Sequence, residues 1–234
     1  MKNFNSQQSI GEIVSILPKA SEVFRKYSID FCCGGNRALA EAIKEQKLNE
    51  EEVMQKLEEA YLETKELSKN VNFREMKSPE LIDYIINTHH AYLRRALPET
   101  ADLTNKILRA HGGNHQELFK VHKLFNNLRT ELEQHLIKEE ELLFPTIKKY
   151  EDKPSQELLE DINRVMKETE DEHEGAGDIL KELRKITNEY SVPDDGCRTY
   201  HLAYSMLQEI EGDLFQHIHL ENNILFKRYA ANKG

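Results

Sequence analysis

Six residues in the C-terminal two-thirds of the chain combine metal-binding side chains with helical spacing. They are four histidines and two glutamates: His90, His135, His173, His217, Glu139 and Glu221. Each glutamate follows one of the histidines by four residues, so the two side chains share one face of a helix, one turn apart. Imidazoles combined with bridging carboxylates suit iron or manganese. These residue types therefore predict a carboxylate-bridged site for two metal ions.

The six residues interrupt apolar stripes whose members recur at intervals of three and four positions. Leu128 and Leu132, for example, precede His135 on one such stripe. Stripes with this spacing are typical of long amphipathic helices. Short segments rich in Gly, Pro and Asn separate the stripes: 111–114, 152–155 and 192–196. Because breaks this short make neighbouring helices antiparallel, we expect an all-α, up-down-up-down four-helix bundle over residues 78–234.

The four histidines are also expected at one height of this bundle. Two residues on antiparallel helices lie level when they are equally far from the turn between them. The midpoints of the three successive histidine pairs fall inside the three breaks, in Gly112-Gly113, at Pro154 and at Asp195. The two glutamates lie one turn away on diagonal helices. Buried carboxylates without a partner are costly, and a pair of metal ions would compensate them.

A single histidine on an apolar face is usually an ordinary core residue, and one His-x-x-x-Glu pair is common by chance. Two such pairs and two further level histidines favour the metal site. His89 adjoins His90 and carries the same donor, although the apolar stripe runs through His90. His111 lies too far from the common level, and Glu172 is expected to support a ligand or line an entrance. The remaining histidines are interpreted as surface residues: His115, His122, His201 and His219.

Residues 1–70 are expected to form a separate small helical domain. Asn49 can cap its last helix, which we expect from Glu50 to about Lys69. The segment Cys32-Cys33-Gly34-Gly35 interrupts the helical pattern. Two thiols beside a helix start predict a lowered pKa, exposed sulfur and a chemical role for Cys32 and Cys33. The alternative is a tight turn with buried thiols, and two adjacent cysteines alone cannot form a closed zinc site.

Composition excludes several other classes of protein. The 234 residues carry a formal net charge of −10, which argues against nucleic acid or an anionic membrane as the main partner. No apolar stretch is long enough to span a bilayer, and the N-terminus has no signal-peptide core, so we expect the cytoplasm. Three cysteines cannot build a disulfide framework, and Cys197 is interpreted as incidental.

Taken together, these motifs resemble the iron–sulfur cluster repair di-iron proteins, also called the repair-of-iron-centres family. The resemblance covers nearly the whole chain. Five segments carry it: 27–39 (YSIDFCCGGNRAL), His90 with 97–99 (LPE), 135–145 (HLIKEEELLFP), 172–177 (EHEGAG) and 217–226 (HIHLENNILF). A Cys-Cys motif joined to a haemerythrin-like bundle is far more specific than either part alone.

The resemblance implies a cytosolic stress protein that restores iron–sulfur clusters damaged by nitric oxide or oxidants, as an iron donor. It implies the same six ligands, with the histidines terminal and Glu139 and Glu221 bridging, and it selects His90 over His89. The implied partners are iron–sulfur proteins with damaged clusters, with nitric oxide or oxygen as small ligands. A second copy of the chain, in a homodimer, is a further partner that the sequence leaves open.

The chain departs from the oxygen-carrying haemerythrins, whose third helix carries two ligand histidines four residues apart. Here Thr169 and Gly177 occupy the positions four residues either side of His173, and neither can replace a histidine. Open coordination positions favour reactive or labile iron over oxygen storage. Two alternatives to iron donation stay open: a di-iron enzyme that reduces nitric oxide or handles oxygen, with Cys32 or Cys33 near the substrate path, and a sensor of either gas.

Overall fold

The computed structural model describes residues 4–17, 19–67 and 72–230. Within these ranges the regular elements are helices, and the only extended pairing is an isolated bridge between Ser9 and Ala38. The expected all-α class is therefore confirmed. None of the described helices combines the length and the apolar character that crossing a membrane requires. Contacts along the chain define two units, one formed by Ile82–Leu214 and the other by Met1–Leu81 with Phe215–Gly234.

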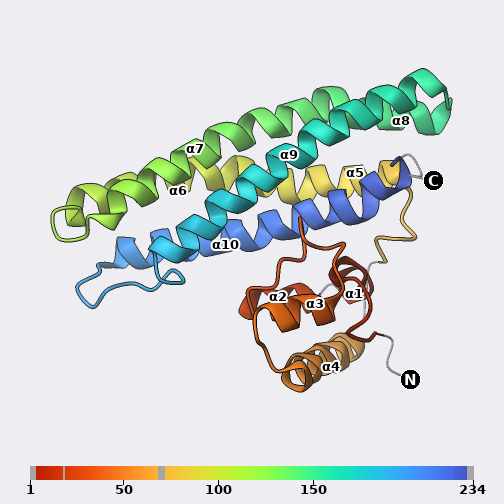
Figure 1. Cartoon of the computed structure of the whole chain (residues 1–234). Helices are drawn as coiled ribbons and strands as arrows, with labels where there is room; N and C mark the ends of the chain where they lie inside the picture. Colours follow the sequence, from red (N-terminus) through yellow and green to blue (C-terminus); the bar gives the residue numbers. More distant parts are fainter. Residues whose placement is uncertain (1–3, 18, 68–71, 231–234) are drawn as a thin grey trace. The chain divides into compact units, whose positions relative to one another are not determined.

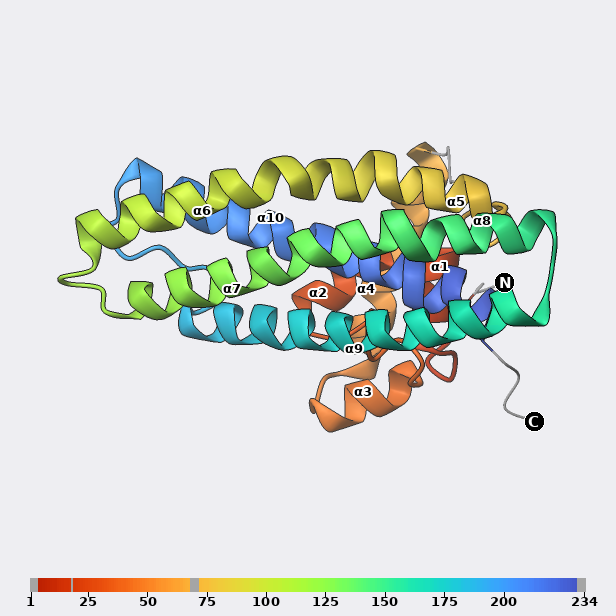
Figure 2. The ribbon, with the colours of Figure 1, turned by 90° about the horizontal axis from the view of Figure 1, so that it is seen from above.

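The unit Ile82–Leu214 is a four-helix bundle whose long helices run alongside one another (Figures 1 and 2). The first stretch of the bundle consists of α5 (Ser78–Ile85), η1 (Ile86–His90) and α6 (Ala91–His111). The second consists of α7 (Glu117–Lys138), η2 (Glu139–Leu143) and α8 (Phe144–Asp152). The last two are α9 (Gln156–Ile186) and α10 (Arg198–Leu220). Both α5 and α10 continue across the division between the units.

The first two connections between these stretches are short and fall at the predicted breaks, whereas the third lies between Ile186 and Arg198 and begins before the predicted break at 192–196. Ser155 begins α9, where its hydroxyl accepts a hydrogen bond from the Leu158 amide at 3.2 Å. Gly112 follows the end of α6, and a larger residue would not fit there, because a Cβ atom would lie 2.5 Å from the carbonyl oxygen of Leu108. The up-down-up-down order follows from these turns, with α6 against α7 and α7 against α9.

Three π-helical turns interrupt the long helices, and each contains a residue predicted to bind metal. They are η1 with His90, η2 with Glu139, and η3 (Glu221–Leu225) with Glu221. A π turn holds an extra residue, so it changes the direction of every side chain that follows, and such turns are frequent at functional sites. The even helical rise assumed from the sequence is therefore wrong at these three places.

The other unit combines four N-terminal helices with the C-terminal segment of the chain. The N-terminal helices are α1 (Ile10–Ile16), α2 (Ala20–Lys26), α3 (Leu39–Glu45) and α4 (Glu50–Leu67). Ser9 and Glu12 form a capping box at α1, and the Asn49 side chain caps α4 as expected. The apolar faces pack into one core that includes Ile10, Phe24 and Leu57.

The C-terminal segment of this unit contains the end of α10, then η3 and η4 (Phe226–Arg228). Within the unit, η3 contacts α1, and the ring centroid of Phe215 lies 5.9 Å from that of Phe31. Residues 69 and 70, the expected ends of the fourth helix and of the small domain, lie outside the described residues. The division into domains 1–70 and 78–234 stays a proposal.

Candidate metal centre

The bundle unit brings three predicted ligands together in its core. His135, Glu139 and His173 each offer a ligand atom within 4.8 Å of the others. Their exposed fractions are 3%, 0% and 1%, so water does not reach these groups freely. The two imidazoles face each other, with Nε2 of His173 lying 3.1 Å from Nε2 of His135. Convergent ring nitrogens beside a carboxylate form a donor set that suits a metal ion.

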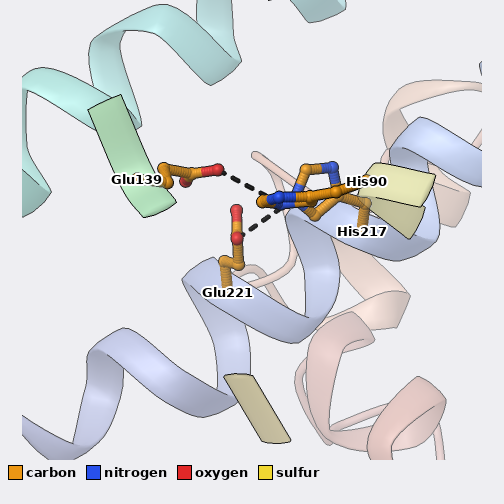
Figure 3. Close-up of side chains that lie close together, drawn as sticks. All are labelled: His90, Glu139, His217 and Glu221. Atoms are coloured by element: carbon orange, nitrogen blue, oxygen red, sulfur yellow. Dashed lines mark ion pairs between the residues drawn. The ribbon is translucent and has the colours of Figure 1, made fainter. Parts of the chain in front are cut away.

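A fourth predicted ligand, His90, points at the same carboxylate from η1. Its Nε2 lies 3.4 Å from Oε2 of Glu139, and the Nε2 of His135 lies 3.3 Å from that same oxygen. Figure 3 draws the pair formed by His90 and Glu139. Two imidazoles from different helices therefore direct the same ring nitrogen at one buried carboxylate.

The opposite ring nitrogens of these two histidines are held by outer carboxylates. Nδ1 of His90 lies 2.7 Å from Oε1 of Glu140, and Nδ1 of His135 lies 2.8 Å from Oε2 of Glu172. An Nδ1–H that donates to a carboxylate leaves the Nε2 lone pair available for a metal. The expected supporting role of Glu172 fits this contact. The role of Glu140 was not predicted from the sequence. The one signal for it was Arg94, a basic residue one turn after His90, which binds the Glu140 carboxylate.

These contacts also lower the pKa values of the outer carboxyl groups. Burial raises the pKa of Glu140, but hydrogen bonds from Arg94 and His90 outweigh it and the net pKa is lowered. The hydrogen bond from His135 is the main cause that lowers the pKa of Glu172 to about 2, with Lys138 contributing in the same direction against partial burial. Both groups therefore stay ionised and keep the imidazole Nδ1 atoms protonated.

The remaining two predicted ligands form a pair in the C-terminal segment of the other unit. His217 Nε2 lies 3.1 Å from Oε1 of Glu221, and both side chains have an exposed fraction of 0%. Figure 3 draws this pair, which comes from the end of α10 and the start of η3. The four-residue spacing predicted by the sequence thus places the imidazole and the carboxylate on one face of the helix.

The other histidines differ more from the sequence interpretation. His201 is exposed as expected, and His115 and His122 are half-buried. His219 is buried instead, with Nδ1 3.4 Å from the Phe31 carbonyl oxygen, and burial lowers its pKa to about 4. His89 is also buried, and its Nδ1 contacts Asp213 at 2.9 Å. The interpretation of His219 as a surface residue is therefore wrong.

The Cys32-Cys33 segment forms a turn in which Cys32 is buried and Cys33 is half-buried. The two sulfur atoms lie 3.8 Å apart. The contact with Cys33, together with burial and the nearby Asp30, raises the pKa of the Cys32 thiol well above its ordinary value. For Cys32, the expected lowered pKa and exposed sulfur are therefore wrong, because the side chain is buried.

A pocket of about 500 Å³ opens beside the bundle ligands. Its lining includes His135 and His173 together with charged residues on the same two helices, Glu131, Lys138 and Glu172. The Lys138 ammonium binds Glu172 at 2.6 Å. Small polar molecules or ions can therefore approach these imidazoles from the α7–α9 side of the unit.

The bundle and its imidazole–carboxylate core define a haemerythrin-type metal-binding protein. Residues 81–229 match the family described as the hemerythrin HHE cation-binding domain. Residues 6–61 match a second family, ScdA_N, described as a domain of unknown function.

Several named proteins match nearly the whole chain. A Staphylococcus haemolyticus protein named iron-sulfur cluster repair protein ScdA is 30% identical over 96% of this chain and 99% of its own length. A probable iron-sulfur cluster repair protein of Haemophilus influenzae is 35% identical over 97% and 99%. Iron-sulfur cluster repair protein YtfE of Escherichia coli O157:H7 is 34% identical over 97% and 98%. This chain belongs to the iron–sulfur cluster repair family.

Proposed function

We propose that this protein restores damaged iron–sulfur clusters by donating iron from a di-iron centre in its haemerythrin-like domain. The observation that carries the proposal is the convergence of His90 and His135 on Glu139, with both Nδ1 atoms held by outer carboxylates. That arrangement directs two imidazole Nε2 atoms at one buried carboxylate before any metal binds. The names of the relatives supply the substrate class, which is an iron–sulfur protein with a damaged cluster.

Six residues form the proposed ligand set, four of them terminal imidazoles and two of them bridging carboxylates: His90, His135, His173, His217, Glu139 and Glu221. All six are at most 3% exposed, and all six fall within the one stretch, 81–229, that matches the cation-binding family. Nitrogen and oxygen donors suit iron or manganese, and the repair names favour iron. Bound iron would supply exchangeable ferrous ions and one-electron redox chemistry.

The remaining side chains favour iron that can leave. Thr169 and Gly177, one turn either side of His173, offer no further imidazole to the site. Fewer strong ligands per ion leave positions for water, so iron is held less tightly than in a fully ligated centre. The pocket lined by His135 and His173 offers a path for a small molecule or an ion.

The same pocket also has room for nitric oxide or oxygen, which gives a second candidate function: a redox enzyme in which either gas reacts at the di-iron pair. A pocket of about 500 Å³ is far larger than either gas requires, so it does not select between the two candidates.

The cytoplasmic location expected from the sequence stays a prediction.

The experiment that tests the proposal follows iron in two proteins at once. Metal analysis of the purified chain is expected to give two irons per chain, and a single tightly held zinc would contradict the site. The iron-loaded chain is then incubated with a cluster-depleted acceptor. Stoichiometric loss of iron with recovery of the acceptor cluster supports donation. Multiple turnover of nitric oxide or oxygen without iron loss would support the enzyme instead.

A further inference from the structure

The C-terminal segment that carries His217 and Glu221 presents a second set of polar side chains on its other face. Helical residues two positions apart point about 200° away from each other around the axis. The side chains of His219 and Asn223 therefore point away from the face that carries His217 and Glu221. Both are buried, with exposed fractions of 1% and 6%, and both contact the turn that contains Cys32.

Asn223 makes the closer of these contacts. Its side-chain amide donates a hydrogen bond to the carbonyl oxygen of Cys32 at 2.9 Å and a longer one to that of Phe31 at 3.4 Å. The Phe31 oxygen also lies 3.4 Å from Nδ1 of His219. A buried amide with two backbone partners holds the peptide groups of the turn in place, because breaking those bonds would leave polar groups without water.

Two glycines make room for the Asn223 side chain. A Cβ atom on Gly11 of α1, or on Gly35 of the turn, would lie 2.8 Å from Oδ1 of Asn223. Both distances are shorter than a real carbon–oxygen contact, so any larger residue at either position would displace the amide. Gly11 and Gly35 are themselves joined by a 2.7 Å hydrogen bond from N to O. The asparagine thus fills a space that α1 and the turn leave open.

The turn is held from its other side by Asp30. One carboxylate oxygen of Asp30 accepts hydrogen bonds from the amides of Cys32 at 3.2 Å and Gly34 at 3.1 Å. The amide groups of Cys32 and Gly34 are therefore fixed locally. The carbonyl group of Cys32, by contrast, is fixed by a residue 191 positions later in the chain. A displacement of the turn must consequently move Asn223.

We propose that Asn223 is a positioning residue that couples the Cys32-Cys33 turn to the metal ligand Glu221. Glu221 and Asn223 belong to the same π-helical turn, η3, so the backbone that orients one orients the other. The inference rests on the proposed iron-donating function and deepens it. It gives a route by which the state of the thiol turn reaches a ligand of labile iron without either sulfur binding the metal.

The test uses Asn223→Ala in the full-length chain, with two measurements. Alkylation of Cys32 and Cys33 by iodoacetamide in the metal-free chain is expected to become roughly tenfold faster, because a buried hydrogen bond that restrains the turn is lost. The visible spectrum of the iron-loaded chain is expected to shift while iron content stays near the wild-type value. The matched control is Asn126→Ala, since Asn126 lies on α7 outside the π turns and its side-chain amide donates to the His122 carbonyl oxygen of the same helix at 2.8 Å. It is expected to change neither quantity.

Gly11→Ala tests the same contact with the sequence of the turn and Asn223 itself unchanged. Its Cβ atom would lie 2.8 Å from Oδ1 of Asn223 and 3.0 Å from the backbone oxygen of Gly35, so we expect faster alkylation and a shifted spectrum again. In the double variant the clash with the amide is gone and only the contact with Gly35 remains, so the two effects should combine less than multiplicatively. If either single variant fails to fold by circular dichroism, the other still carries both readouts.

Two results would overturn the inference. One is faster alkylation of the Asn223→Ala chain with a wild-type iron spectrum, which would make the asparagine a clamp on the turn alone. The other is independent action of the two substitutions. Neither readout requires an acceptor protein, so a failure of the wild-type chain to repair an acceptor would refute the proposed function without deciding this test.

Discussion

Metal binding at the residue scale depends on which nitrogen of each imidazole is available. Neutral histidine carries its proton on one ring nitrogen, and a hydrogen-bond partner decides which one. Glu140 and Glu172 hold the Nδ1 atoms of His90 and His135, and the pKa values of both carboxyl groups are lowered. The two outer carboxylates thereby favour the tautomer in which Nδ1 carries the proton and Nε2 carries the lone pair.

Glu140→Ala is expected to weaken metal binding by about tenfold or more, because His90 loses the partner that orients its ring and selects its tautomer. Titration of the metal-free chain with ferrous iron under anaerobic conditions measures the effect. Glu141→Ala, which changes an exposed neighbour on the same turn, is the control and should bind as the wild type does. Equal affinities in the two variants would remove Glu140 from the site.

Cys197 provides a second prediction at this scale. Its isolation in the sequence suggests an incidental residue, yet a hydrogen bond with His111 is the main cause that lowers its pKa to about 7. Because the folded-state pKa is the lower one, any stabilisation from this contact is present above the ordinary thiol pKa and is lost as pH falls through about 7.

His111→Ala should raise the pKa of Cys197 toward its ordinary value of 9.0. The rate of Cys197 alkylation at neutral pH should then fall about tenfold, since the thiolate is the reactive form. The measurement is a pH–rate profile followed by mass spectrometry of the Cys197 peptide. His201→Ala, an exposed change on α10, should leave the profile unchanged, and an unshifted profile in His111→Ala would contradict the assigned contact.

At the scale of elements, the junction after α9 carries unusual backbone strain. Asn188, Glu189 and Tyr190 have φ angles of 49°, 60° and 59°, the left-handed region that side chains disfavour by roughly 1 kcal/mol or more each. The hydroxyl of Thr187 accepts a hydrogen bond from the Tyr190 amide at 3.0 Å. Arg184 binds both Glu189 and the fully buried Glu211 of α10. This arginine therefore joins α9, its strained end and α10.

Arg184→Met is expected to destabilise the chain by about 3–5 kcal/mol, because it leaves the Glu211 carboxylate buried without its cation. Replacing Glu211 with Leu as well should recover most of the loss. Chemical denaturation followed by circular dichroism measures both effects. Arg164→Met breaks a comparable pair with Asp161 that is more than half exposed on each side, at 60% and 51%, and should leave stability almost unchanged, because exposed ion pairs contribute little. Similar losses in the two methionine variants would refute the assigned role.

At the scale of the whole molecule, the chain joins a thiol-bearing turn to a metal-binding domain. The turn lies within the stretch 6–61 that matches one family, and every proposed ligand lies within the stretch 81–229 that matches the other. The two thiols and the proposed metal ligands are therefore carried by different parts of the sequence. Removal of the sulfur atoms alone leaves all six proposed metal ligands in place.

The double variant Cys32→Ser/Cys33→Ser is accordingly expected to bind iron normally and to keep a near-native di-iron spectrum, whereas its repair of an acceptor cluster falls several-fold. Serine preserves the size of the side chain, so the carbonyl groups that Asn223 holds should stay in position. Iron content, the visible spectrum and acceptor recovery are measured on one preparation. Repair at the native rate would make the motif only a structural turn, and loss of iron would make the cysteines part of the metal site.

The local pattern of the sequence was enough to predict the helices, the turns and the candidate ligands. Apolar spacing places a residue on a given face of a helix, so the four-residue interval between His135 and Glu139 was sufficient to assign both to one face. The break residues Gly112 and Ser155 act within one or two turns of their own helices, so these helix ends could also be predicted from the sequence. Fold class follows from such local rules because each helix in a bundle buries one stripe.

Only the tertiary structure decided which neighbours cover each face. Glu140 lies 50 positions from His90, and Asn223 lies 191 positions from Cys32, so no local spacing relates them. Burial of Cys32 and His219 likewise depends on packing between segments far apart in the chain. The π turns reflect the same cause, since an extra residue per turn is tolerated only where surrounding contacts stabilise it. Periodicity specifies the face on which a side chain lies, whereas its pKa, tautomer and contacts depend on what the fold packs against that face.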